Sequence, residues 1–295
     1  MEEATIPEIQ RSNLASVILT MLNIGIENIQ TFDFMDSPGT EDIASAMRQL
    51  RLLGAVGDDN KLSDLGRKMA GFPLDPKLTA TILAGAELGC GEEILSIVSL
   101  VSGENVFNQP ANREKQEEAV MAHKVKLELK VVQQNLPEYF SQKFSANEGD
   151  LVTLLNVWKS FKAGNKSTSW CQQHFLINRH LQFAMEVRRQ LVELCHNCGV
   201  RLSSSRDMDT VRQALARGLF INVAQRTTEG HYVTLDSGQK CHIHPQSVLF
   251  NKKPEVVVFT EMVHTSKTYI RGCSLVDVTW LQEIQPEYFR THRVV

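Results

Sequence analysis

The spacing of the hydrophobic residues changes once, near residue 200, and this change limits the fold more than any other feature of the chain. Before it, apolar side chains recur every three or four residues, as over 151–161, which is the spacing of one buried helix face. After it, short β-branched and aromatic runs lie between turn residues, a pattern typical of strands. We therefore expect a multidomain α+β protein with its helices first and a small sheet domain last.

Residues 1–73 predict a winged-helix domain. Two amphipathic helices come first, the earlier one beginning at the candidate cap Ser12 and the later one ending at Gly54. A short hairpin over 55–62 and a third helix over 63–70 follow. In many proteins a winged helix binds DNA, and as often it is a module that docks on another protein. Few basic residues precede residue 60, which disfavours the duplex-binding alternative.

Residues 74–200 predict a bundle of helices. Asp75 precedes Pro76 in the order of a cap and a first helical residue. The expected helices after this start cover residues 92–101, 112–134, 148–161 and 179–195, of which the first is very apolar and the second highly charged.

Residues 201–295 predict a small OB-fold β-barrel. A helix over 209–224 comes first and a short helix over 280–289 comes last. Between them we expect about five strands, including 232–235, 241–243, 256–263 and 268–270. Short strands within a basic segment are typical of domains that bind oligonucleotides.

The charge is divided unequally between the two halves of the chain. Residues 1–150 carry 13 basic and 23 acidic side chains, and residues 151–295 carry 18 and 11. The basic half suits a polyanion, although an uneven distribution without function is the alternative. The longest apolar stretch, 94–101, is too short to span a membrane, and the acidic start at Met1 predicts no secretory signal. Six cysteines in 295 residues favour a reducing compartment, the nucleus or the cytoplasm.

The sequence contains no motif for self-sufficient catalysis. It has neither a Gly-rich phosphate loop ending in Gly-Lys-Ser/Thr nor a zinc-protease helix nor a nucleophile elbow. Cys195 and Cys198 could bind zinc if Cys241 and His244 completed the site, but two packed thiols at a helix end are the favoured interpretation. We predict no catalytic residue and no metal site.

Several polar residues fall on expected loops of the last domain. Hydroxyls, an imidazole and cations are the groups that hold the phosphates and sugars of a single strand. The alternative is that they satisfy turns or lie in solvent. The candidates are His244, Ser247, Thr265, Ser266, Lys267 and Arg271.

Short motifs along almost the whole chain resemble, in order, the C-terminal region of DEAH-box ATP-dependent RNA helicases. The stretches that carry the resemblance are 6–14, 32–35 with Pro38, 65–70, 72–74, 93–95, 170–171 with Phe175, 243–249, and 265–267 with Tyr269 and Arg271. Within that family, 67–74 and 92–99 are most similar to the nucleolar member that serves ribosome biogenesis.

The resemblance implies a winged-helix, a ratchet-like and an OB-fold domain, in that order. In the family, two RecA-like domains precede them and hold ATP and Mg²⁺, so this chain would be the accessory half of a motor and inactive alone. The implied partners are single-stranded RNA, the RecA domains and an activating protein on the winged-helix or ratchet surface. The implied location is the nucleus, more narrowly the nucleolus, with the cytoplasm left open.

The resemblance also implies roles for single residues. Thr265, Ser266, Lys267, Tyr269 and Arg271 would lie near RNA, with His244 and Ser247 supporting their loop, whereas Gln10 and Arg11 would dock on a RecA domain. Two features depart from the family: Leu151 replaces a usual histidine, and the segment 106–148 is longer. A non-catalytic adaptor that binds nucleic acid or protein is the alternative function.

Overall fold

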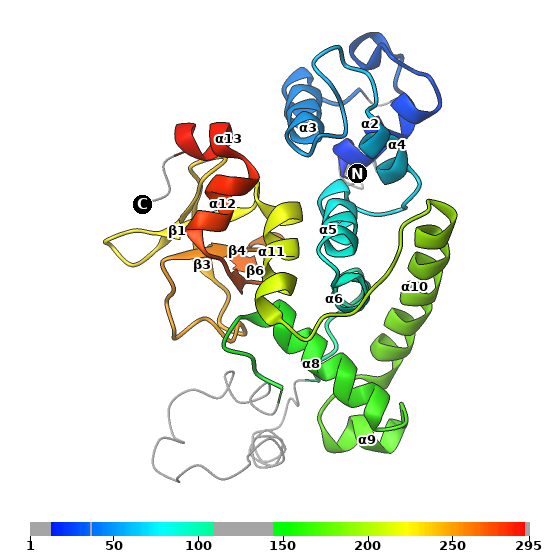
Figure 1. Ribbon diagram of the computed structural model, residues 1–295. Coiled ribbons are helices and arrows are strands. Elements are labelled where there is room, and N and C mark those ends of the chain that lie inside the picture. Colours follow the sequence, from blue (N-terminus) through cyan, green and yellow to red (C-terminus); the bar gives the residue numbers. More distant parts are fainter. Residues whose placement is uncertain (1–12, 36, 109–143, 293–295) are drawn as a thin grey trace, which may run out of the picture.

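The computed structural model describes residues 13–35, 37–108 and 144–292. Three groups of elements follow one another along the chain (Figure 1). Helices α2 to α4 form one end, helices α5 to α10 form the middle, and a sheet flanked by α11, α12 and α13 lies beside the middle helices. The predicted order of a winged helix, a helical domain and a sheet domain is confirmed.

The winged-helix segment has the three predicted helices. They are α2 (Leu14–Asn23), α3 (Thr40–Leu52) and α4 (Asp64–Ala70), with a 3-10 turn η1 (Ile29–Thr31) between the first two. The N-cap of α2 is Asn13 rather than Ser12, because the Asn13 side chain accepts a hydrogen bond from the Ala15 amide. Gly54 follows α3 with φ +72°, as expected of a residue that ends a helix. The predicted hairpin is reduced to one bridge between Val56 and Leu62.

The middle helices are α5 (Pro76–Glu87), α6 (Gly91–Val101), α8 (Asp150–Ala163), α9 (Thr168–Gln173) and α10 (Asn178–Asn197). Asp75 caps α5, with Pro76 in its first turn, as predicted. The short helix α9 was not predicted, because six residues give too few turns for a periodic signal. The helix predicted over 112–134 lies outside the described residues.

The predicted helix 209–224 is too long at its C-terminal end. Helix α11 covers Met208–Leu219, and the next residues enter strand β1 (Val223–Arg226). Val223 and Ala224 pair with Val258 and Val257, so pairing with a distant strand overrides the local helical spacing.

The strands form one open sheet in the order β5-β6-β3-β2-β1-β4-β7. Their bounds are β2 (Tyr232–Thr234), β3 (Lys240–Ile243), β4 (Val256–Val258), β5 (Glu261–His264), β6 (Thr268–Arg271) and β7 (Ser274–Leu275). All pairs are antiparallel except β3 and β6. The described strands form an open sheet and do not close the predicted small barrel: β5 is an edge, and β7 is followed only by the single bridge between Ser274 and Gly149. The short strand β7 was not predicted.

Two predicted elements are each divided in the structure. The run 256–263 becomes β4 and β5, because the Phe259 amide still donates to the Asn222 carbonyl beside β1, whereas the Thr260 amide donates to the Arg271 carbonyl of β6. The predicted helix 280–289 becomes α12 (Val278–Ile284) and α13 (Pro286–Thr291). Pro286 explains this second break, since proline has no N–H to continue a helix.

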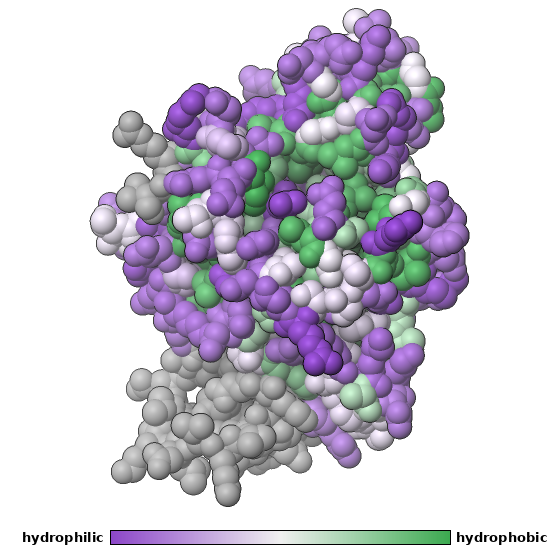
Figure 2. Space-filling model, viewed as in Figure 1, coloured by the Kyte–Doolittle hydropathy of each residue, from purple (hydrophilic) through white to green (hydrophobic). Residues whose placement is uncertain are grey.

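A single large core joins all three groups of elements. It contains Ile18 of α2, Ile82 of α5, Leu215 of α11 and Leu281 of α12, none of which is accessible to solvent beyond 1%. A second cluster lies among α8, α9 and α10, and a third fills the inner side of the sheet. Figure 2 shows apolar side chains on the surface along the seam between the winged-helix segment and α5 and α11. The domains are therefore packed into one body.

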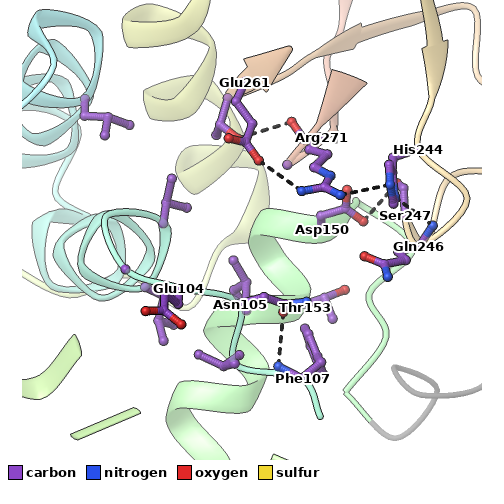
Figure 3. A pocket seen from close by; sticks show the side chains of 18 of the residues that line it. Glu104, Asn105, Phe107, Asp150, Thr153, His244, Gln246, Ser247, Glu261 and Arg271 are labelled. Atoms are coloured by element: carbon purple, nitrogen blue, oxygen red, sulfur yellow. Dashed lines mark hydrogen bonds and ion pairs between the residues drawn. The ribbon is translucent and has the colours of Figure 1, made fainter. Parts of the chain in front are cut away.

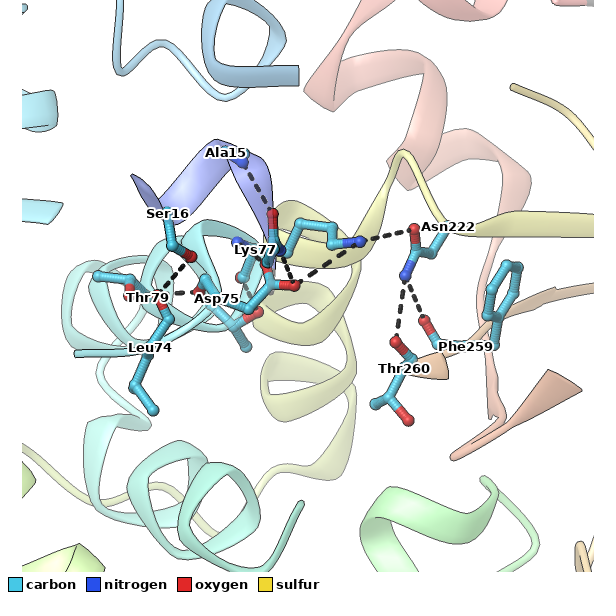
Figure 4. Close-up of polar contacts among 11 residues, drawn as sticks. Ala15, Ser16, Leu74, Asp75, Lys77, Thr79, Asn222, Phe259 and Thr260 are labelled. Carbon is cyan, nitrogen blue, oxygen red and sulfur yellow. Dashed lines mark hydrogen bonds and ion pairs between the residues drawn. The ribbon is translucent and has the colours of Figure 1, made fainter. Parts of the chain in front are cut away.

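A chain of polar contacts also crosses the molecule at the start of α5 (Figure 4). Asn13, at the start of α2, donates to the Asp75 carboxylate at 2.6 Å. Lys77 Nζ donates to Asn222 Oδ1 at 3.2 Å, and the Asn222 amide group donates to the carbonyls of Phe259 and Thr260. These contacts fix the beginning of the helical domain against both neighbours.

Candidate functional site

The sheet has one buried face and one polar face, which follows from the alternation of side chains along each strand. On β3, Cys241 and Ile243 point into the core, whereas Lys240 and His242 point outward. On β6, Ile270 is buried, and its neighbours Tyr269 and Arg271 are partly exposed. Because His242 pairs with Tyr269 in the parallel ladder, the outward residues of both strands share one face.

Rings and cations alternate on this face. The Tyr269 ring lies between two imidazoles, with its centroid 5.5 Å from that of His244 and 6.1 Å from that of His242. Arg271 Nη2 is 3.0 Å from His244 Nε2, and Arg271 Nη1 is 3.8 Å from a Glu261 carboxylate oxygen. We call the set His242, His244, Lys267, Tyr269 and Arg271 the ring-cation face.

His244 is held in its neutral form by its surroundings. Its Nδ1 faces the Gln246 amide at 3.2 Å, and its Nε2 faces the Arg271 guanidinium. Both neighbours are donors, which disfavours a ring with a proton on each nitrogen. Partial burial, followed by the Arg271 charge, lowers the pKa of His244. The lowered pKa favours the uncharged imidazole at neutral pH, so this residue offers a ring face rather than a charge.

A buried carboxylate anchors the loop that follows His244 (Figure 3). Asp150, the first residue of α8, accepts hydrogen bonds at 2.9 Å from the Ser247 hydroxyl, the Val248 amide and the Cys273 amide. Burial raises the pKa of Asp150, and these three bonds oppose that shift. Through Asp150, the helical domain thus positions two parts of the sheet domain: the loop that follows His244 and the backbone at Cys273.

Gly149 permits this close approach of α8 to the sheet. Its φ is +129°, and a Cβ at this position would lie 2.4 Å from the Cys273 carbonyl oxygen. Asp150 donates its own amide to that carbonyl at 2.7 Å, and the Leu275 amide donates to the Glu148 carbonyl at 2.8 Å. The residues before α8 therefore extend the sheet beside β7.

A cavity of about 420 Å³ opens where the ring-cation face meets the helical domain. Figure 3 shows His244, Gln246 and Arg271 on one side of it, and Asn105 and Thr153 on the other. Its charged lining residues are the acidic Asp75, Glu104, Asp150 and Glu261 and the basic Lys77 and Arg271. We call it the main cavity. Because its lining has more carboxylates than cations, it suits the uncharged hydrogen-bonding groups of a ligand better than a phosphate.

The structure divides the predicted binding residues into three groups. His244, Tyr269 and Arg271 lie together beside the main cavity. Thr265, Ser266 and Lys267 are exposed in the turn between β5 and β6, where the Thr265 amide and hydroxyl both donate to the Lys267 carbonyl. Ser247 is 7% exposed and bound to Asp150, which gives it an anchoring role. The predicted docking residues Gln10 and Arg11 lie outside the described residues.

Four residues of this region were not predicted from the sequence. Lys240 and His242 share the period of two with His244, and this alternation could have found them. Asp150 and Lys77 gave no such signal, because their contacts join segments far apart in the sequence.

The cysteines do not meet as a metal site. Cys195 belongs to the large core and Cys241 to the sheet core, and the described residues include no cluster of three or more His, Cys, Asp or Glu side chains placed to hold a metal ion. Among the helices that the structure describes, none is both long enough and apolar enough to span a membrane.

Comparison with known families assigns the three segments. Residues 46–74 match the winged-helix part of the helicase-associated domain, and residues 75–154 match its ratchet-like part. Residues 211–288 match the oligonucleotide/oligosaccharide-binding fold. These three domains define the chain as a helicase-associated region.

Similar proteins identify the kind of helicase. The chain is 42% identical to the ATP-dependent RNA helicase DHX33 of Mus musculus and 37% identical to the splicing-factor helicase prp22 of Schizosaccharomyces pombe, and each match covers 98% of this chain. It is 36% identical to the probable helicase DHX35 of Homo sapiens. The chain belongs to the DEAH-box RNA helicases, whose C-terminal accessory region it matches. It spans 39% of the mouse DHX33 relative and 23% of the yeast one.

Proposed function

We propose that this chain is the RNA-contacting accessory half of an ATP-dependent RNA helicase, and that the ring-cation face meets single-stranded RNA. The observation that carries this proposal is the position of Tyr269 between two imidazoles, with Arg271 on the same strand and Lys267 in the turn just before that strand. Aromatic rings stack on bases of any sequence, and cations follow the backbone. A helicase that translocates needs this sequence-tolerant kind of contact.

The main cavity would then receive bases and sugars. Its carboxylates repel phosphates, but carboxylates, amides and hydroxyls accept or donate hydrogen bonds to sugar hydroxyls and base edges. The neutral His244 fits the same task, because an uncharged ring can approach a base without a counter-charge.

Anisotropy of a fluorescein-labelled decamer of uridine tests the proposal. We expect the chain to bind it more weakly at 200 mM than at 50 mM NaCl, because phosphate contacts release counterions. Tyr269→Ala should cost about 1–3 kcal/mol of binding free energy, the range measured for one stacked base. Phe183→Ala is the matched control, since this exposed aromatic residue lies on α10, and it should leave binding unchanged.

Two outcomes would contradict the proposal. One is a wild-type chain that does not bind the decamer at 50 mM NaCl. The other is an equal effect of Tyr269→Ala and Phe183→Ala. Preferential binding of duplex DNA in the same assay would instead support the duplex-binding alternative.

The activity of the whole protein is also part of this proposal. By analogy with its relatives, ATP and Mg²⁺ would bind in RecA-like domains outside this region, and the chain alone should not hydrolyse ATP. Gln10 and Arg11 would contact those domains, and an activating protein could bind the winged-helix or ratchet surface. Similarity to DHX33 favours a nuclear, more narrowly nucleolar, role in ribosome biogenesis. We place the domain boundaries near residues 73 and 200.

A further inference from the structure

A second cavity opens on the other side of Tyr269. It has a volume of about 530 Å³ and is lined by Glu229, Gly230, His231, Lys240, His242, Lys267 and Thr268. Among the described residues, this lining comes from β3, from the start of β6 with the turn before it, and from the loop before β2, without a residue of the helical domain. We call it the outer cavity.

The charge of the outer cavity is opposite in character to that of the main cavity. Its lining holds two lysines and two histidines against a single carboxylate, Glu229, whose Oε2 lies 3.4 Å from His231 Nδ1. Both lysines are exposed, so their ammonium groups are free to reach a ligand. Partial burial lowers the pKa of His242, and the nearby positive groups of Lys267, His231 and Lys240 lower it further.

The two cavities lie along one line on the polar face of the sheet. His244 lines the main cavity, His242 lines the outer cavity, and the Tyr269 ring lies between these two imidazoles. The backbone from Lys240, the first residue of β3, to His244, the residue after its end, extends over ~13 Å. A segment of a few nucleotides can cover this length, within the site size of a single OB fold.

We propose that the outer cavity binds a backbone phosphate of the same single strand whose bases occupy the main cavity. Lys240 and Lys267 contact the phosphate, His242 donates to it, and the intervening base stacks on Tyr269. This inference rests on the proposed function, and it adds a direction: the RNA leaves the main cavity and runs along β3 and β6 toward Lys240.

The test measures how salt changes the affinity of the full chain for the uridine decamer. Lys240→Gln removes one phosphate contact, so the slope of log affinity against log salt should become shallower by about 0.7. The same relation predicts a loss of about five-fold in affinity at 0.1 M NaCl. Lys159→Gln is the control, because Lys159 is exposed on α8 and lines neither cavity, and its slope and affinity should equal those of the wild type. Lys240→Glu should weaken binding further.

Three results separate the two proposals. If the wild type binds, Tyr269→Ala weakens binding and Lys240→Gln behaves like Lys159→Gln, then the outer cavity is not part of the path and only this inference is wrong. If the wild type does not bind the decamer, the proposed function itself is wrong. Equal thermal midpoints of Lys240→Gln and the wild type show that the variant is folded, and a shallower slope then supports the inference.

Discussion

At the scale of single residues, the shape of the site depends on one side chain of the helical domain. Asp150 holds the Ser247 hydroxyl and two backbone amides, and it replaces the water that these donors would otherwise need. The adjacent Gly149 supplies a backbone conformation that other residues rarely adopt. The pair determines where the loop after His244 lies, and therefore the shape of the main cavity.

Replacing Asp150 should destabilise the protein strongly. Asp150→Ala leaves three donors without their acceptor, and we expect the free energy of unfolding to fall by roughly 3 kcal/mol, measured by urea denaturation. Asp58→Ala is the control, because Asp58 is exposed in the turn before Lys61 and should change stability by less than about 0.5 kcal/mol. Similar small effects of both substitutions would show that water replaces the carboxylate without cost.

At the scale of elements, the crossing of α5 and α11 is the tightest contact between the helical domain and the sheet domain. Gly218 of α11 permits it, since a Cβ there would lie 1.9 Å from Thr81 Oγ1, 2.5 Å from the Thr81 nitrogen and 2.7 Å from the Lys77 oxygen. Two of these three atoms belong to the backbone of α5, so rotation of a side chain cannot relieve the clash. Lys77, which lines the main cavity, belongs to the same turn.

Gly218→Ala should therefore lower stability although alanine favours helices. The substitution gains about 1 kcal/mol of helix propensity but forces the two helices apart, at a cost of roughly 1–3 kcal/mol or more. We expect a lower urea midpoint. Ser45→Ala, at an exposed position of α3, receives the propensity gain without the clash and should be neutral or slightly stabilising. A higher midpoint for Gly218→Ala would mean that the crossing is looser than its geometry implies.

At the scale of the whole molecule, three domains share one apolar core. The large cluster runs from α2 through α5 to α12, and the contacts of Asp75, Lys77 and Asn222 cross the same junctions. A domain that lost its neighbours would expose part of this core to water, so its independent unfolding is disfavoured. This packing keeps the ring-cation face at a fixed distance from the winged helix.

We accordingly expect one cooperative unfolding transition. Tryptophan fluorescence reports on Trp158 and Trp170 near the second cluster and on Trp280 of α12, whereas far-ultraviolet circular dichroism reports on all helices. The two signals should change together with temperature, which is the usual criterion for a single cooperative unit. An earlier fluorescence transition, separate from the loss of helices, would indicate that the domains unfold independently.

The sequence alone determined the elements whose signals are local. The period of three to four residues located α5, α6, α8 and α10, the Asp75-Pro76 pair located a helix start, and short β-branched runs located most strands. It also placed His244, Tyr269 and Arg271 in one functional group through family motifs. Errors arose at the ends of elements, as at Val223, where pairing with another strand decides the conformation.

Only the tertiary structure decided how these elements meet. Asp150 lies 97 residues from Ser247 and 123 from Cys273, and no local pattern encodes such a contact. Packing likewise decides three other features. They are the open form of the sheet, the separation of an acidic main cavity from a basic outer one, and the place of His242 beside Tyr269. Periodicity specifies which side of a helix or strand is buried, whereas the partner that buries it is selected by the whole chain.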